Sequence, residues 1–188
     1  MVYLIVNVHR SGSSMLMRCL EAGGLNPVYD KSSDAMNHHA PGDYVPNPNG
    51  FYQFTGEVLP SFAMQYDGRL IKFPIGEVSN LPKGDYKIII LKRNPLEIRR
   101  SMARWTPFNA WGGQEAATYL YDKFMSAVEL VLKTKGKVSL IEVNYRDIVK
   151  NPLLSFERIK ASGWPINPAL CAEKVDASLH RNKLEKDK

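Results

Sequence analysis

The chain has little of what marks secreted, metal-binding or membrane proteins. Its 188 residues include only two cysteines, Cys19 and Cys171, too few for a disulfide framework or a cysteine-based metal site. No apolar run approaches the ~20 residues that a membrane-spanning helix needs. The N-terminus lacks the basic flank and small-residue cleavage site of a signal peptide. We therefore expect a cytoplasmic protein that binds no metal.

The charge is unbalanced toward the positive, but it is not concentrated. The net charge is +6, and 44% of the residues are hydrophobic, as in an ordinary globular domain. An excess of positive charge suits an anionic ligand or a nucleic acid. No lysine- and arginine-rich tract is interleaved with aromatics, so a nucleic acid is the less favoured partner. Without repeats or low-complexity linkers, we expect one domain over residues 1–188, with 183–188 as a frayed tail.

The first twenty residues predict a strand, a short turn and a helix. Val2–Val8 is apolar and β-branched, and the turn Arg10–Ser14 is built of small residues around Gly12. One helical face then carries Met15, Leu16, Cys19 and Leu20. Backbone N–H groups and the positive end of the helix dipole would converge at this turn, where Gly12 allows close approach. The segment predicts a site for a phosphorylated nucleotide or its analogue, unless a serine simply caps the helix.

The turn is not a Walker A motif. That motif has a lysine and then a serine or threonine after its last glycine, the hydroxyl being there to bind Mg²⁺. Here the cation, Arg10, precedes Gly12, and two serines follow it. A kinase or NTPase is therefore disfavoured.

The rest of the chain alternates between predicted strands and helices. Strands are expected at Leu25–Tyr29, Arg69–Phe73, Asp85–Leu91 and Val138–Val143, and helices at Phe54–Tyr66, from Asn94-Pro95 to about Trp105, at Gln114–Lys133, at Pro152–Lys160 and after Pro168. This alternation predicts a three-layer α/β/α domain with a central parallel sheet. The polar stretch at residues 30–50 is too long for a simple connection and is expected to be a binding loop or a lid.

A second group of anion-binding residues follows the apolar strand Asp85–Leu91. Arg93 comes directly after that strand, and Ser101 lies seven residues beyond Asn94, the expected helix cap. Seven residues are close to two helical turns, so Ser101 returns to the face on which the helix begins. A guanidinium and a hydroxyl could then bind one further anion. Alternatively, Arg93 is a surface charge and Ser101 an ordinary helical serine.

Together these segments resemble the sulfotransferases that use PAPS (3'-phosphoadenosine-5'-phosphosulfate). His9–Ser14 is similar to their 5'-phosphosulfate loop, and Arg93–Ser101 to their 3'-phosphate motif. Arg69–Lys72 is similar to the strand that precedes that motif. Val143–Pro152 resembles the segment whose tyrosine lies near the adenine, and Leu179–Lys183 the basic C-terminal segment. The matches keep the family's order over most of the chain.

The resemblance implies a P-loop NTPase-like sulfotransferase fold and transfer of a sulfuryl group from PAPS to a hydroxyl or amine. The acceptor would be a small molecule, a sugar or a peptide, and PAP would be released. Lys72, with Arg10, would assist the transfer. The PAPS-binding residues would be Arg10, Ser11, Gly12, Ser13, Ser14, Arg93, Ser101, Tyr145 and Arg181.

The chain departs from the family at the general base. Cytosolic members have a histidine two residues after the strand lysine, where this chain has Pro74. Related bacterial sequences have a glutamate where this chain has Gln53, and an amide cannot act as a base. These departures leave open a second reading, a sulfotransferase-like module that binds PAP or another nucleotide without turnover.

Four other residues are candidates for the base. His38 and His39, in the long polar stretch, have a suitable ordinary pKa, although paired loop histidines are often spectators. Glu57 begins the predicted helix, where a carboxylate is also favoured by the helix dipole alone. Asp43 is a weaker candidate, and the remaining alternative is that the chain has no general base.

Overall fold

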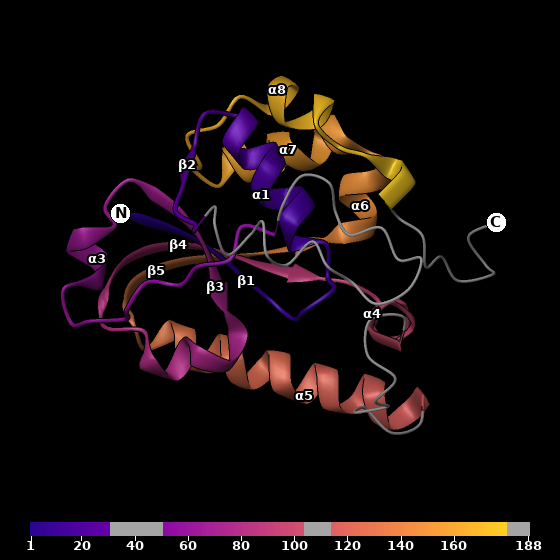
Figure 1. Ribbon diagram of the computed structural model, residues 1–188, viewed down its shortest axis with the longest axis horizontal. Helices are drawn as coiled ribbons and strands as arrows, with labels where there is room; N and C mark the ends of the chain where they lie inside the picture. The colour runs from indigo at the N-terminus through magenta and orange to yellow at the C-terminus, as the bar shows by residue number, and fades with distance from the viewer. Residues whose placement is uncertain (31–50, 104–113, 180–188) are drawn as a thin grey trace.

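The computed structural model describes residues 1–30, 51–103 and 114–179, and over these residues it forms a three-layer α/β/α domain (Figure 1). All strand pairings in its sheet are parallel, in the order β2-β3-β1-β4-β5. The strands are β1 (Val2–Asn7), β2 (Asn26–Pro27), β3 (Arg69–Pro74), β4 (Gly84–Lys92) and β5 (Gly136–Asn144). The helices are α1 (Ser13–Ala22), α3 (Phe62–Gln65), α4 (Pro95–Ala103), α5 (Gln114–Lys133), α6 (Tyr145–Lys150), α7 (Pro152–Ala161) and α8 (Pro168–Glu173), with 3₁₀ turns at Ile75–Asn80 and Ala177–Leu179. The predicted fold class is confirmed.

Each face of the sheet is covered by its own hydrophobic core. Leu4, Val6, Ile88 and Ile90 pack in one core with α5, and Ile5, Ile89 and Leu91 pack in the other with α1, α7 and α8. Figure 1 shows α5 on one side of the sheet and α1, α7 and α8 on the opposite side. Since successive strand residues point to opposite faces, burial of both faces explains why β1 and β4 are apolar throughout rather than alternating.

The strand order places the turn after β1 at a topological switch point. Asn7, at the end of β1, pairs with Pro74 of β3 on one side and with Leu91 of β4 on the other. The chain leaves β1 toward β2 and β3 and later returns on the far side as β4 and β5. Ligands of open parallel sheets bind outside the carboxyl ends of the strands at such a point. Arg10, Lys72 and Arg93 all lie at this edge.

Three local predictions needed correction. The helix predicted at Phe54–Tyr66 is wrong over most of its length, because only Phe62–Gln65 is helical. Gly56 and Pro60 interrupt the segment, since glycine and proline both disfavour a helix interior. The strand predicted at Leu25–Tyr29 is reduced to Asn26–Pro27. The sequence reading also missed α6, where the Asn144 side chain accepts the Arg146 N–H at 2.9 Å and so caps the helix.

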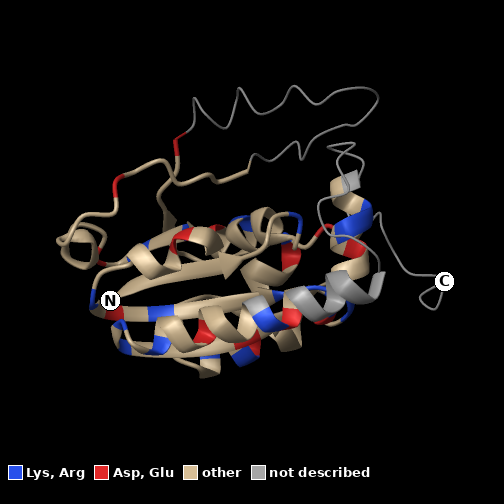
Figure 2. Cartoon of the chain, turned by 90° about the horizontal axis from the view of Figure 1, so that it is seen from below, with Lys and Arg blue, Asp and Glu red and all other residues tan. Residues whose placement is uncertain are grey.

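Charge is interspersed over the described surface. Figure 2 shows basic and acidic residues mixed along the described helices. None of the described helices has the length and the hydropathy that a membrane crossing requires.

Candidate functional site

The turn between β1 and α1 ends in an uncapped helix N-terminus. Arg10 and Gly12 both have left-handed backbones, with φ of 68° and 97°. Gly12 is the N-cap residue of α1, no side chain caps this helix, and its first turn carries no acidic residue. The alternative that a serine caps the helix is therefore wrong. The N–H groups at the positive end of the helix dipole are available to an anion.

Gly12 is required by a neighbouring ring as well as by its own backbone. A Cβ added to Gly12 would lie 2.2 Å from Cδ2 of Tyr145, which is buried at the start of α6. A φ of 97° also disfavours any residue with a side chain. The turn therefore packs closely against the Tyr145 ring. The predicted contact between Tyr145 and an adenine stays a prediction.

Arg93 is buried, not a surface charge. Its Nε donates to Oε2 of Glu97 at 2.8 Å, and the side chains of this ion pair are only 6% and 4% exposed. Its Cζ lies 4.5 Å from the centroid of the Tyr145 ring. Its Nη1 donates to the backbone oxygen of Arg10 at 3.1 Å. The guanidinium is therefore held in one orientation, against the turn that follows β1.

Ser101 joins the two groups of residues predicted to bind anions. Its side chain is buried on α4, and its Oγ accepts a hydrogen bond from Nε of Arg10 at 2.9 Å. Ser101 is therefore not an ordinary helical serine, because its hydroxyl bonds a side chain from another element. Arg10 lies 83 and 91 positions from Arg93 and Ser101 in the sequence, yet the three residues form one connected cluster.

Two buried polar atoms in this cluster have no hydrogen-bond partner among the described residues. They are Oγ of Ser11 and Nη2 of Arg93. An unsatisfied buried polar group typically costs about 1–3 kcal/mol, so such atoms usually mark a missing partner. A hydroxyl and a guanidinium N–H both suit the oxygens of an anion. Because both atoms are covered in this conformation, an anion would reach them only after a neighbouring group shifts.

Lys72 and Ser14 donate to the same backbone oxygen. Nζ of Lys72, on β3, and Oγ of Ser14, at the start of α1, both bond the carbonyl of Phe51, the latter at 3.2 Å. Two predicted donors for the sulfate end of PAPS therefore already converge on one oxygen. A ligand oxygen could replace that carbonyl.

Of the four candidate bases, only Glu57 lies among the described residues. Glu57 is exposed, and it lies five residues before α3 rather than at a helix start. His38, His39, Asp43 and the predicted lid lie outside the described residues, as do Arg181 and the tail at 183–188. Among the described residues, no cluster of three or more His, Cys, Asp and Glu side chains is placed to hold a metal.

His9 directly precedes Arg10, and no chemical role was predicted for it. Although His9 is exposed at the surface, desolvation by the surrounding atoms, and then the charges of Lys72 and Arg10, lower the pKa of His9 below its ordinary 6.5. A neutral imidazole at pH 7 is a proton acceptor.

We expect the pKa of His9, measured by NMR titration, to rise toward 6.5 in a Lys72→Met variant, because one repelling charge is removed. Because the pKa is lowered in the folded state, the unfolded state binds more protons, and this histidine makes folding more favourable as pH rises toward 6.5. A Lys137→Met variant, changed on exposed Lys137 of β5, is the control. An unchanged or lower pKa in Lys72→Met would contradict the placement of Lys72 beside His9.

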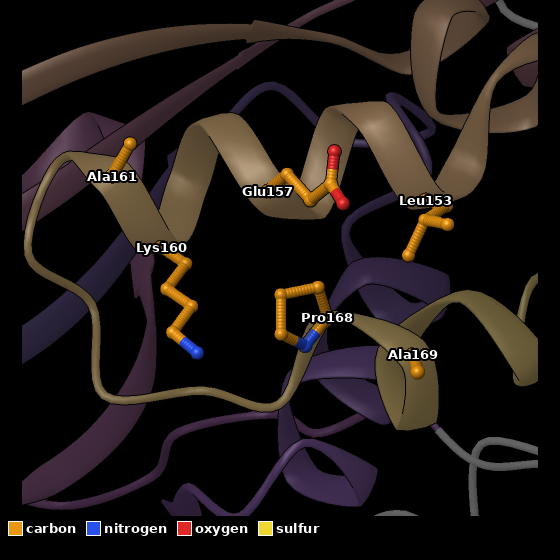
Figure 3. Close-up of a pocket in the computed structure, with 6 residues that line it drawn as sticks. All are labelled: Leu153, Glu157, Lys160, Ala161, Pro168 and Ala169. Atoms are coloured by element: carbon orange, nitrogen blue, oxygen red, sulfur yellow. The ribbon is translucent and has the colours of Figure 1, made fainter.

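A separate hollow of about 640 Å³ lies between α7 and α8 (Figure 3). It is lined by Leu153, Glu157, Lys160, Ala161, Pro168 and Ala169. None of these is a residue predicted to bind the nucleotide.

No protein-family model and no curated protein matches the sequence. Among solved structures, the chain is similar to the crystal structure of mouse sulfotransferase SULT7A1 complexed with PAP. The two are 16% identical with a TM-score of 0.49, and the match covers 98% of this chain and 67% of that chain. The function proposed below rests on the contacts of the chain's own residues.

Proposed function

We propose that this protein is a sulfotransferase that moves a sulfuryl group from PAPS to a hydroxyl or amine and releases PAP. The observation that carries the proposal is the meeting of the two predicted anion-binding groups. Arg10 bonds Ser101 at 2.9 Å, and Arg93 bonds the backbone of Arg10 at 3.1 Å. A nucleotide with phosphates on both its 5' and 3' positions needs two anion sites on the same edge of the sheet.

The residues present suit the charge changes of sulfuryl transfer. A bond forms from the acceptor oxygen or nitrogen to sulfur, and the bond from sulfur to the bridging oxygen of the 5'-phosphate breaks. The electron pair stays on that bridging oxygen, and the proton of the acceptor passes to solvent water. Arg10 and the N–H groups at the start of α1 would stabilise the developing negative charge, since preorganised donors act most strongly where charge appears. Lys72 would orient the sulfate.

Calorimetry with PAP tests the ligand. We expect the wild-type protein to bind PAP and the double variant Arg93→Ala, Ser101→Ala to bind it at least about 100-fold more weakly, because a charged and a neutral hydrogen bond are both lost. The control is Ser126→Ala, whose exposed hydroxyl bonds only within its own helix, to the oxygen of Asp122. Equal affinity of the wild type and the double variant for PAP would contradict the proposal.

A non-catalytic module that binds PAP is the second candidate, favoured by Pro74 and Gln53 at positions where relatives carry other residues. Incubation with sulfur-labelled PAPS and a panel of sugars, phenols and peptides separates the two candidates. Label on any acceptor supports the enzyme. Tight PAP binding without label on any acceptor supports the module.

A further inference from the structure

We propose that Arg93 and Ser101 are also positioning residues for Arg10, so that the residues assigned to the 3'-phosphate set affinity at the 5' turn. This inference rests on the proposed function. On this view the two anion sites are energetically coupled rather than independent.

The backbone of Arg10 needs external support. Its φ of 68° lies in the left-handed region, which a residue with a side chain rarely adopts. Such conformations persist where the surrounding structure over-determines them, and they gather at ligand sites. The left-handed backbone of Arg10 must therefore be stabilised by contacts with other parts of the domain.

Arg93 and Ser101 provide those contacts from outside the turn. Arg93 fixes the main chain of Arg10 by donating a hydrogen bond to its carbonyl oxygen. Ser101 fixes the side chain of Arg10 by accepting a hydrogen bond from its Nε. The partners are 83 and 91 positions away in the sequence, so the turn cannot supply this support locally. Arg93 is itself fixed by the buried carboxylate of Glu97. The support is thus anchored in the interior of the domain.

The hydroxyl of Ser101 can serve both sites at once. It accepts from Arg10, and a serine hydroxyl retains one O–H donor that a phosphate could accept. Hydrogen bonds in such a chain strengthen one another. An anion at Ser101 would therefore tighten the hold on Arg10 as well as occupy the 3' site.

Adenosine 5'-monophosphate, which lacks the 3'-phosphate, is the probe that separates the two views. We expect Ser101→Ala to weaken binding of this nucleotide about fivefold, as loss of one hydrogen bond that orients Arg10 predicts. Ser101→Cys, nearly isosteric but a weak acceptor, is expected to show a similar loss. In an Arg10→Ala background, Ser101→Ala should change this affinity less than about twofold, because the coupled partner is already gone. Ser126→Ala is the control, and the thermal transition of each variant reports its folding.

Three outcomes would overturn the inference, and they are distinguishable. If Ser101→Ala weakens PAP binding but leaves adenosine 5'-monophosphate unchanged or bound more tightly, the two sites are independent and the proposed function stands. If the wild-type protein binds neither nucleotide, the proposed function fails as well. A loss that persists in full in the Arg10→Ala background also contradicts the coupling.

Discussion

Replacing Glu97 with leucine is expected to lower the free energy of unfolding by about 3–5 kcal/mol, because it leaves the Arg93 guanidinium buried without its counter-charge. The ion pair is 2.8 Å long and nearly inaccessible to solvent. The same change should also weaken PAP binding, since Arg93 loses the partner that orients it. Urea unfolding followed by circular dichroism measures the first effect, and calorimetry measures the second.

The chain offers a matched control for this prediction. Glu129 and Lys133 of α5 have the same i,i+4 spacing and the same 2.8 Å separation, but their side chains are 31% and 61% exposed. Glu129→Leu should therefore change stability by no more than about 1 kcal/mol. The double variant Arg93→Leu, Glu97→Leu should recover most of the stability, because apolar replacement of a buried pair is often neutral, but not PAP binding. A cost for Glu97→Leu no larger than that for Glu129→Leu would show that the buried pair is not as described.

Replacing Gly12 with alanine should cost about 3 kcal/mol, combining a disfavoured left-handed backbone with overpacking against the Tyr145 ring. The added Cβ would lie 2.2 Å from that ring, and the backbone φ is 97°. PAP binding should fall at the same time, because the turn must move off Tyr145. Chemical unfolding and calorimetry with PAP measure the two effects.

Gly68 separates the two contributions. It has a φ of 72°, and a Cβ there would meet nothing within 4 Å, so Gly68→Ala carries only the backbone cost of about 1 kcal/mol. The double variant Gly12→Ala, Tyr145→Ala removes the clash and should cost less than the sum of its two single changes. Equal costs for Gly12→Ala and Gly68→Ala would mean that the ring does not limit the turn.

Elements whose stabilising patterns are local were predicted well. The apolar runs of β1 and β4 and the apolar spacing of α5 predicted these elements, and the bounds of α5 agree fully. Asn94 behaves as the expected cap, its Oδ1 accepting the Leu96 N–H at 2.9 Å. The helix predicted at Phe54–Tyr66 failed because its apolar residues fit a helical period while glycine and proline interrupt the backbone.

Some features of the candidate site were predicted from the sequence, and others were not. Residue type and position were enough to select Arg10, Arg93 and Ser101 as anion-binding candidates, and the strand order puts them at one edge. That Arg93 would be buried against Glu97 was not predicted, although the i,i+4 spacing could have suggested the pair. The assignments of the ligands, of the base and of the cytoplasmic setting stay predictions.

By itself, the sequence determined the strands and most of the helices, the parallel α/β class and the residue types gathered around two turns, because apolar period, caps and glycines act over a few neighbouring positions. Only the tertiary structure decided that the Tyr145 ring lies against Gly12 and that Arg10 is held by Arg93 and Ser101. The physical reason is that these contacts join segments more than 80 positions apart, and the register of β1 against β4, set by packing on both faces of the sheet, brings them within hydrogen-bond distance.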